Sequence, residues 1–112
     1  MANILIIDDD QMLSETICRQ VQYMKHSGTF ALSITEGLEK LRADTFDVVF
    51  LDVRLPDGNG LDALPQIKSM EYEPEIIIIT GEGDPDGAEL AIRSGAWDYI
   101  EKPLSMKKSP CN

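Results

Sequence analysis

Short runs of apolar residues alternate along this chain with segments whose apolar positions recur at helical spacing. The runs are rich in β-branched residues and show little polar alternation, which is typical of strands covered on both faces. They span Asn3 to Ile7, Phe30 to Ile34, Val48 to Leu51 and Ile76 to Ile79, with a weaker fifth run from Trp97 to Ile100.

The segments between these runs predict amphipathic helices. Their apolar positions are Leu13, Ile17, Val21 and Met24, then Leu38 and Leu41, then Leu61, Leu64 and Ile67, and last Leu90, Ala91 and Ser94. Strands that alternate with helices in this way pair in parallel through right-handed crossovers. The pattern therefore predicts a doubly wound α/β fold, and the length of 112 residues suits one domain with one core.

Capping residues mark the expected ends of the helices. Thr35 before Glu36 and Asp84 before Pro85 are typical of helix starts, and Asp10 fits the start of the first helix. Gly28 and Gly95 are expected to end helices, because glycine adopts the left-handed conformation that often follows a last turn.

Charge and composition narrow the classes of function. A net charge of −10 disfavours direct nucleic-acid binding, because nothing offsets repulsion by the phosphate backbone. No apolar run approaches the roughly 20 residues of a membrane helix, and Asn3 and Asp8 argue against a secretory leader, so we expect a cytoplasmic protein. The two cysteines, Cys18 and Cys111, suggest neither a disulfide framework nor a metal site.

The C-terminal segment is short for a final helix. Only nine residues follow Pro103, which is barely two helical turns. We expect residues 105–112 to form a truncated last helix or a tail. Such a helix would leave an apolar strip of the sheet uncovered unless another chain, for example in a homodimer, covers it.

Polar residues stand where each predicted strand ends. Asp8 and Asp9 follow the first apolar run, Asp52 the third, Thr80 the fourth, and Lys102 lies just past the fifth. In open α/β sheets, ligands bind outside the carboxyl ends of the strands, where residues remote in sequence converge. We therefore expect one site that contains three carboxylates, a hydroxyl and an ammonium group.

Clustered carboxylates repel one another unless a cation lies between them or one of them takes a proton. Oxygen ligands favour a hard dication, and Mg²⁺ commonly takes one or two carboxylates with waters and a phosphate oxygen. With the repulsion neutralised, one carboxylate can attack phosphorus in line while Lys102 stabilises charge on the equatorial oxygens. A nearby Thr80 hydroxyl could then satisfy the added phosphoryl oxygens by moving inward.

The chain resembles the receiver domain of bacterial two-component response regulators over residues 3 to 104. The resemblance rests on ILIIDDD at the first strand, VVFLDVRLPDGNGLD around the third, IIIITGEG at the fourth and AIRSGAWDYIEKPL at the fifth. It implies a flavodoxin-like five-stranded parallel sheet with strand order 2-1-3-4-5.

The resemblance also implies a role for each site residue. Asp52 would be the phosphoacceptor, with Asp9, Asp52 and the backbone carbonyl of Arg54 as direct Mg²⁺ ligands and Asp8 as the second acid that positions the ion. Thr80 would be the switch hydroxyl and Lys102 the lysine that precedes a proline in this family. Tyr99 would be the aromatic switch, although it also fits a core position.

The expected partners follow from the same resemblance. A sensor histidine kinase would supply the phosphoryl group. An output domain would normally lie on the same full-length chain, and we expect this domain to control transcription. The protein would be a switch that catalyses only its own phosphorylation and dephosphorylation. Phosphorylation would reshape the surface around residues 88–95 and the last strand.

The sequence argues against three other functions. A Mg²⁺-dependent phosphohydrolase with an aspartyl nucleophile would place a second acid two residues after Asp52, where this chain has Arg54. A flavin-binding module would need a phosphate loop rich in Ser, Thr and Gly after the first strand, where three aspartates stand instead. A receiver that no longer switches would not need the complete set of matching residues.

Pro56, Asp57 and Gly58 also predict an ordinary turn that, with Gly60, shapes the loop beside Asp52.

Overall fold

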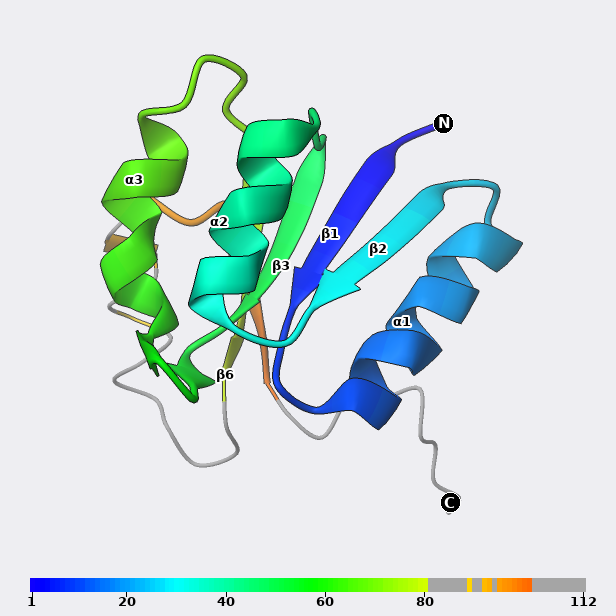
Figure 1. The fold of residues 1–112 in the computed structure, drawn as a ribbon, viewed down its shortest axis with the longest axis horizontal. Coiled ribbons are helices and arrows are strands. Elements are labelled where there is room, and N and C mark those ends of the chain that lie inside the picture. The colour runs from blue at the N-terminus through cyan, green and yellow to red at the C-terminus, as the bar shows by residue number, and fades with distance from the viewer. Residues whose placement is uncertain (81–88, 90–91, 94, 102–112) are drawn as a thin grey trace.

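The predicted strands pair in parallel in one sheet in a computed structural model of the chain (Figure 1). The structure describes residues 1–80, 89, 92–93 and 95–101, with the backbone alone for Thr80 and Glu101. The sheet order is β2-β1-β3-β6-β7, which is the predicted order 2-1-3-4-5 counted along the chain. Its strands are β1 (Asn3–Ile7), β2 (Ser27–Ala31), β3 (Val48–Asp52), β6 (Glu75–Thr80) and β7 (Asp98–Glu101).

Three helices and a short hairpin are described around this sheet. The helices are α1 (Gln11–Tyr23), α2 (Ile34–Ala43) and α3 (Leu64–Lys68), with a 3-10 turn η1 (Gly60–Ala63) that leads into α3. The hairpin consists of β4 (Arg54–Leu55) and β5 (Gly58–Asn59), which pair antiparallel. Helix α1 lies on one face of the sheet, and α2 and α3 lie on the other (Figure 1).

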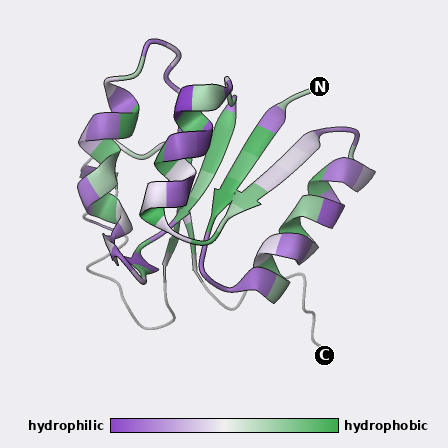
Figure 2. Ribbon diagram, viewed as in Figure 1, coloured by the Kyte–Doolittle hydropathy of each residue, from purple (hydrophilic) through white to green (hydrophobic). Residues whose placement is uncertain are grey.

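The central strands are buried on both faces, as their continuous apolar runs predict. In β1, Ile4 and Ile6 pack in the cluster under α1, whereas Leu5 and Ile7 pack in the cluster under α2 and α3. Each fully buried Leu or Ile contributes about 1.5–3 kcal/mol relative to an exposed one, so both layers are held to the sheet by burial. Figure 2 shows the strongest hydropathy along these inner strands and a paler edge strand β2.

The helical spacing is confirmed for most of the predicted positions. Ile17 and Val21 of α1 are buried and Leu13 packs against them, but Met24 is 62% exposed, because the helix ends at Tyr23. In the second layer Leu41, Leu61, Leu64 and Ile67 are buried, and Leu38 is half-buried against them. The positions at Leu90, Ala91 and Ser94 lie outside the described residues, as does the start predicted at Asp84.

The prediction of the second strand is wrong by three residues. The strand spans Ser27–Ala31, and Ile34 is the first residue of α2. Ser33, rather than Thr35, caps this helix, because its Oγ accepts a hydrogen bond from the Glu36 N–H at 3.1 Å. The Glu36 carboxylate in turn accepts one from the Leu32 N–H at 2.9 Å. The Ser33 bond caps the helix, and the Glu36 bond satisfies the N–H of the residue before the cap, so both favour a helix start over the strand propensity of Ile34.

The prediction that Gly28 ends a helix is also wrong. Gly28 lies within β2, where a Cβ atom would come within 2.7 Å of Val21 Cγ2 and 3.2 Å of Cys18 Cα. The glycine therefore permits close packing of α1 on the sheet edge, and Lys25, with φ of 74°, makes the left-handed turn after α1. Gly95 fits its predicted place, since its φ is 101° and its N–H bonds to the Ile92 carbonyl.

The expected truncated helix at residues 105–112 lies outside the described residues. On the sheet face that α1 covers, Val48 and Phe50 of β3 are half-buried and pack against the α1 cluster. No helix within the described part of the chain is long and apolar enough to span a bilayer.

Candidate functional site

Asp8 and Asp9 lie directly after β1, and only the first is buried. Asp8 is 0% exposed, and its N–H donates to the Ala31 carbonyl at 3.0 Å, which extends the pairing of β1 with β2 by one residue. Its Oδ1 accepts a hydrogen bond from the Asp10 N–H at 2.9 Å, while the Ser14 hydroxyl donates to its carbonyl at 3.2 Å. These bonds hold the Asp8 carboxylate at the strand end.

Asp10 begins α1, as the sequence predicts. Its Oδ1 accepts a hydrogen bond from the Leu13 N–H at 3.0 Å, the bond of an N-cap residue. The three consecutive aspartates therefore divide into one helix cap and two side chains at the strand end.

Asp52 is the last residue of β3 and is 4% exposed. It pairs with Ile79 of β6, and the next residue, Val53, donates its N–H to the Ile79 carbonyl at 3.2 Å. The Arg54 N–H lies 3.4 Å from Asp52 Oδ1, at the long limit of a hydrogen bond. The acceptor proposed from sequence is thus held by the sheet on one side and by the first residue of the hairpin on the other.

The strand ends bring three carboxylates together. One oxygen from each of Asp8, Asp9 and Asp52 lies within 4.8 Å of the other two. Three oxygen donors of this hardness fit a small hard dication such as Mg²⁺, which binds through one or two carboxylates and keeps several waters. Since Asp9 is exposed, the cluster is open to solvent on one side.

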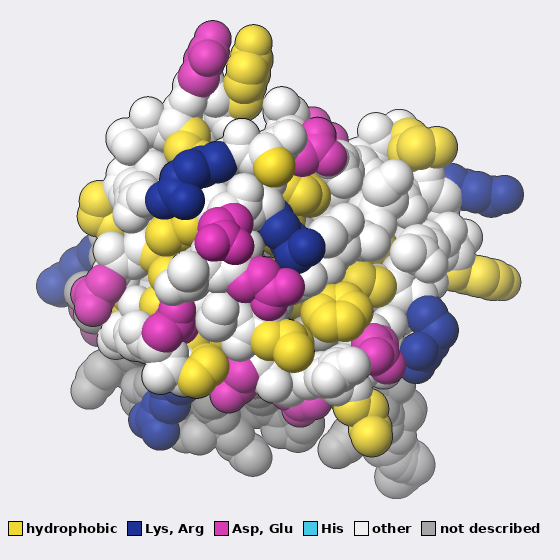
Figure 3. Space-filling view, viewed as in Figure 1, with side chains coloured by type: hydrophobic (Ala, Val, Ile, Leu, Met, Phe, Trp, Pro, Cys, Tyr) yellow, Lys and Arg dark blue, Asp and Glu magenta, His cyan; other side chains and the backbone are white. Residues whose placement is uncertain are grey.

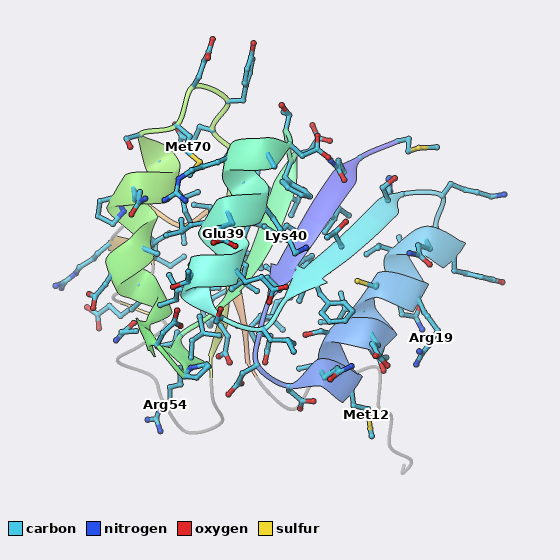
Figure 4. All side chains as sticks on the ribbon, in the orientation of Figure 1. Met12, Arg19, Glu39, Lys40, Arg54 and Met70 are labelled. Carbon is cyan, nitrogen blue, oxygen red and sulfur yellow. The ribbon has the colours of Figure 1, made fainter. Side chains whose placement is uncertain are left out.

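The remaining predicted site residues are described in part. The backbone of Thr80 ends β6, one residue past the pair that joins Asp52 to Ile79, but its side chain is outside the described atoms. Tyr99 lies in β7 beside Ile78 and is 44% exposed, so it is not a core residue here. Lys102 lies outside the described residues. The Arg54 side chain extends outward, away from the body of the molecule (Figure 4).

Sequence reasoning missed a second role for Asp57 at the tip of the hairpin. Its carboxylate accepts hydrogen bonds from the Ile34 and Thr35 N–H groups, each at 2.9 Å, and from the Thr35 hydroxyl at 2.8 Å. These bonds, the Ile34 N–H foremost, lower the pKa of Asp57 to about 2. Pro56-Asp57-Gly58 predicted only a turn, because the sequence does not show that α2 begins beside it.

Three of the described basic side chains lie beside acidic ones. Lys40, Lys68 and Arg93 each lie within 4.0 Å of a Glu carboxylate. On the face seen in Figure 3, the Lys and Arg side chains stand apart from one another, several of them beside Asp and Glu side chains. That face therefore offers a nucleic acid no continuous basic surface.

Comparison with known proteins points to one family. The family described as response regulator receiver domain matches residues 4–109. The response regulator protein PilR of Pseudomonas aeruginosa is 33% identical over 102 residues, which cover 91% of this chain and 23% of PilR. The C4-dicarboxylate transport transcriptional regulatory protein DctD of Rhizobium meliloti is 32% identical over 106 residues, 95% of this chain and 23% of DctD. The chain thus spans about a quarter of the length of these relatives.

A solved structure supports the same assignment. A response regulator receiver domain protein from Clostridium thermocellum has a TM-score of 0.82 and 36% sequence identity. The match covers 93% of this chain and 84% of that one, so sheet and helices correspond over nearly the whole fold.

Proposed function

The chain belongs to the receiver domain family of two-component response regulators, and we propose that it is a Mg²⁺-dependent switch phosphorylated on Asp52. The observation that carries this proposal is the gathering of Asp8, Asp9 and Asp52 at the carboxyl ends of β1 and β3. Of the three, Asp52 ends a central strand and is nearly buried, yet the adjoining Asp9 leaves the cluster open to a donor.

Each residue has a proposed part in the transfer. Asp9, Asp52 and the Arg54 carbonyl would hold Mg²⁺, with Asp8 fixing its position. Bound Mg²⁺ supplies positive charge that offsets the carboxylates and the transferring phosphoryl group. An Asp52 oxygen attacks phosphorus in line, the bond from phosphorus to the donor breaks, and the donor leaves with that electron pair. Lys102 would stabilise the charge on the equatorial oxygens.

The proposed output is a conformational change next to the phosphorylated residue. Thr80 would move inward to donate to the new phosphoryl oxygens, and Tyr99 would turn from its exposed position into the space vacated. The phosphorylated form would populate a minor pre-existing conformation rather than a new fold. The output surface predicted from the sequence, around residues 88–95 and the last strand, would then change its partner preference.

The proposed donor is a sensor histidine kinase, and the proposed setting is the cytoplasm. DctD is named a transcriptional regulatory protein, and its length supports an output domain beyond the part that matches this chain. We therefore propose that the switch controls transcription through such a domain.

Intact-mass spectrometry after treatment with acetyl phosphate and Mg²⁺ tests the chemistry. We expect wild type to gain about 80 mass units, the mass of one phosphoryl group, and Asp52→Asn to gain none. Asp62→Asn, which removes an exposed carboxylate from the neighbouring turn η1, is the matched control and should be labelled like wild type. Labelling of Asp52→Asn at the wild-type rate would refute Asp52 as the acceptor.

A turnover assay with excess small phosphoester separates a switch from a phosphohydrolase. A switch hydrolyses its aspartyl phosphate slowly and so consumes little donor, whereas an enzyme rapidly turns over an excess of small phosphoesters. Rapid, Asp52-dependent turnover of excess phosphoester would favour the enzyme.

A further inference from the structure

The N–H groups of the first turn of α2 obtain their hydrogen bonds from two different parts of the chain. A helix leaves its first N–H groups without intrahelical partners. Here Ser33 accepts from Glu36 through its side chain and from Gly37 through its carbonyl. The two N–H groups before them, those of Ile34 and Thr35, both donate to Asp57, which lies 22 to 23 residues away in sequence.

Asp57 lies at the tip of the hairpin whose first residue touches the acceptor. Arg54 pairs with Asn59 and Leu55 with Gly58, so Pro56 and Asp57 form the turn between them. At the open end of the hairpin, the Arg54 N–H approaches Asp52 Oδ1 at 3.4 Å. The Gly60 N–H donates to the Val53 carbonyl at 2.7 Å, which closes the loop just after the hairpin.

Apolar contacts lie along the same joint. Leu55 is buried in the core cluster of α2 and α3, and Ile34 packs against that cluster. A Cβ atom on Gly58 would lie 3.5 Å from Ile34 Cδ1, so the hairpin rests on the first turn of α2. These contacts limit the distance between hairpin and helix but not the rotation of the hairpin, because dispersion contacts are not directional. The three hydrogen bonds to Asp57 supply the direction.

We propose that Asp57 is a positioning residue for the acceptor site, because it fixes the hairpin to α2 and so fixes the Arg54 backbone beside Asp52. This inference rests on the proposed function, in which the Arg54 carbonyl is a Mg²⁺ ligand. Asp57 itself touches neither the metal nor the phosphoryl group. Its carboxylate sets the orientation of the two-strand hairpin, and the open end of that hairpin sets the position of one ligand.

The charge state of Asp57 agrees with this role. The hydrogen bonds from Ile34 and Thr35 lower its pKa to about 2, so the side chain is a carboxylate at neutral pH. A carboxylate accepts more strongly from backbone N–H groups than a neutral oxygen does, and it also favours the positive end of the helix dipole.

The test compares Asp57→Ala with Ser33→Ala, which removes the other cap of the same helix but leaves the hairpin alone. Both should lower the melting temperature by a few degrees, because both remove caps from α2. Only Asp57→Ala should weaken Mg²⁺ binding several-fold, measured by isothermal titration calorimetry, and slow labelling by acetyl phosphate at subsaturating Mg²⁺. Asp57→Asn keeps an acceptor oxygen on a side chain of the same length, so it should recover part of the loss.

A measurement without metal isolates the anchoring from the chemistry. In metal-free protein, the amides of Ile34, Thr35 and Gly60 should exchange hydrogen faster in Asp57→Ala than in wild type. In Ser33→Ala the Gly60 amide should exchange at the wild-type rate, since that substitution does not reach the hairpin.

The outcomes are distinguishable. Equal Mg²⁺ affinity and labelling in Asp57→Ala and Ser33→Ala would reduce Asp57 to an ordinary cap and overturn the inference. If wild type neither bound Mg²⁺ nor accepted a phosphoryl group, the proposed function would fail instead. Exchange at Gly60 would then decide the anchoring alone, where faster exchange in Asp57→Ala supports it and unchanged exchange contradicts it.

Discussion

Gly60 passes so close to the carbonyl oxygen of Asp52 that a Cβ atom at this position would overlap it. The contact is between backbone atoms, so no side-chain rotation relieves it. Gly60 also donates its N–H to the Val53 carbonyl at 2.7 Å. The loop that follows Asp52 therefore folds back onto the end of β3, and only glycine fits at this position.

We expect Gly60→Ala to displace the end of β3. The added methyl group should lower the free energy of unfolding by about 1–3 kcal/mol, the usual range for overpacking, and slow labelling of Asp52. Gly37→Ala is the control, because its Cβ would meet Ile7 Cδ1 at 2.5 Å, the end of a flexible side chain under α2. Urea unfolding and acetyl phosphate labelling should show lost stability in both variants but slowed labelling in Gly60→Ala alone. Labelling slowed equally in both would mean that general destabilisation, not the Asp52 contact, limits the reaction.

We expect Asp52→Asn to stabilise the metal-free protein. Three carboxylates within 4.8 Å of one another cost free energy, and neutralising one should raise the free energy of unfolding by about 1–3 kcal/mol. Thermal melts in EDTA measure this gain, and Glu39→Gln, at an exposed position of α2, should change little. Mg²⁺ should raise the melting temperature of wild type more than that of Asp52→Asn. A lower melting temperature for Asp52→Asn in EDTA would contradict this electrostatic account.

The sheet and the acidic cluster were predictable because both follow from short-range patterns and parallel topology. Runs buried on both faces predicted β1, β3 and β6 nearly to the residue, and parallel pairing necessarily brings Asp8 and Asp52 to one edge. The roles of Asp52, Arg54, Thr80, Tyr99 and Lys102 in phosphoryl transfer stay predictions.

The sequence predictions were wrong at positions where contacts between residues remote in sequence determine the local structure. The apolar run from Phe30 to Ile34 predicts one strand, but the hydrogen bonds of Ser33 and Glu36 start α2 inside that run. Gly28 was expected to end a helix, but it lies in β2, where its lack of a side chain allows Val21 and Cys18 to approach closely. Asp57 was predicted only as a turn residue. Its hydrogen-bond partners in α2 are far away in sequence, and no local pattern indicates them.

We expect Cys18 to resist thiol reagents in the folded protein. Burial raises the pKa of this thiol, and the nearby Glu15 charge raises it further, so less thiolate forms at pH 8 than for an exposed cysteine. In Cys111→Ser, where Cys18 is the only cysteine, reaction with Ellman's reagent should be slow in buffer and fast in urea. Rapid reaction in buffer, at the rate of the unfolded chain, would show that α1 does not keep this thiol buried against the sheet.

We expect the contribution of Asp57 to stability to disappear in acid. Its pKa is about 2 in the folded protein, below the ordinary value of 3.8, because backbone N–H groups of α2 donate to the carboxylate. A lowered pKa means that the stabilisation is present above about pH 4 and is lost as the pH falls towards 2. The difference in melting temperature between wild type and Asp57→Asn should therefore be constant from pH 5 to about pH 7 and shrink below about pH 4.

Ser33→Ala is the control for this pH dependence, because its hydroxyl caps the same helix but does not titrate. Its melting deficit relative to wild type should persist through the range in which the Asp57→Asn deficit fades. Parallel fading of both deficits would mean that α2 itself unfolds in acid, whereas a constant Asp57→Asn deficit down to pH 2 would mean that the charge of Asp57 does not strengthen its bonds to Ile34 and Thr35.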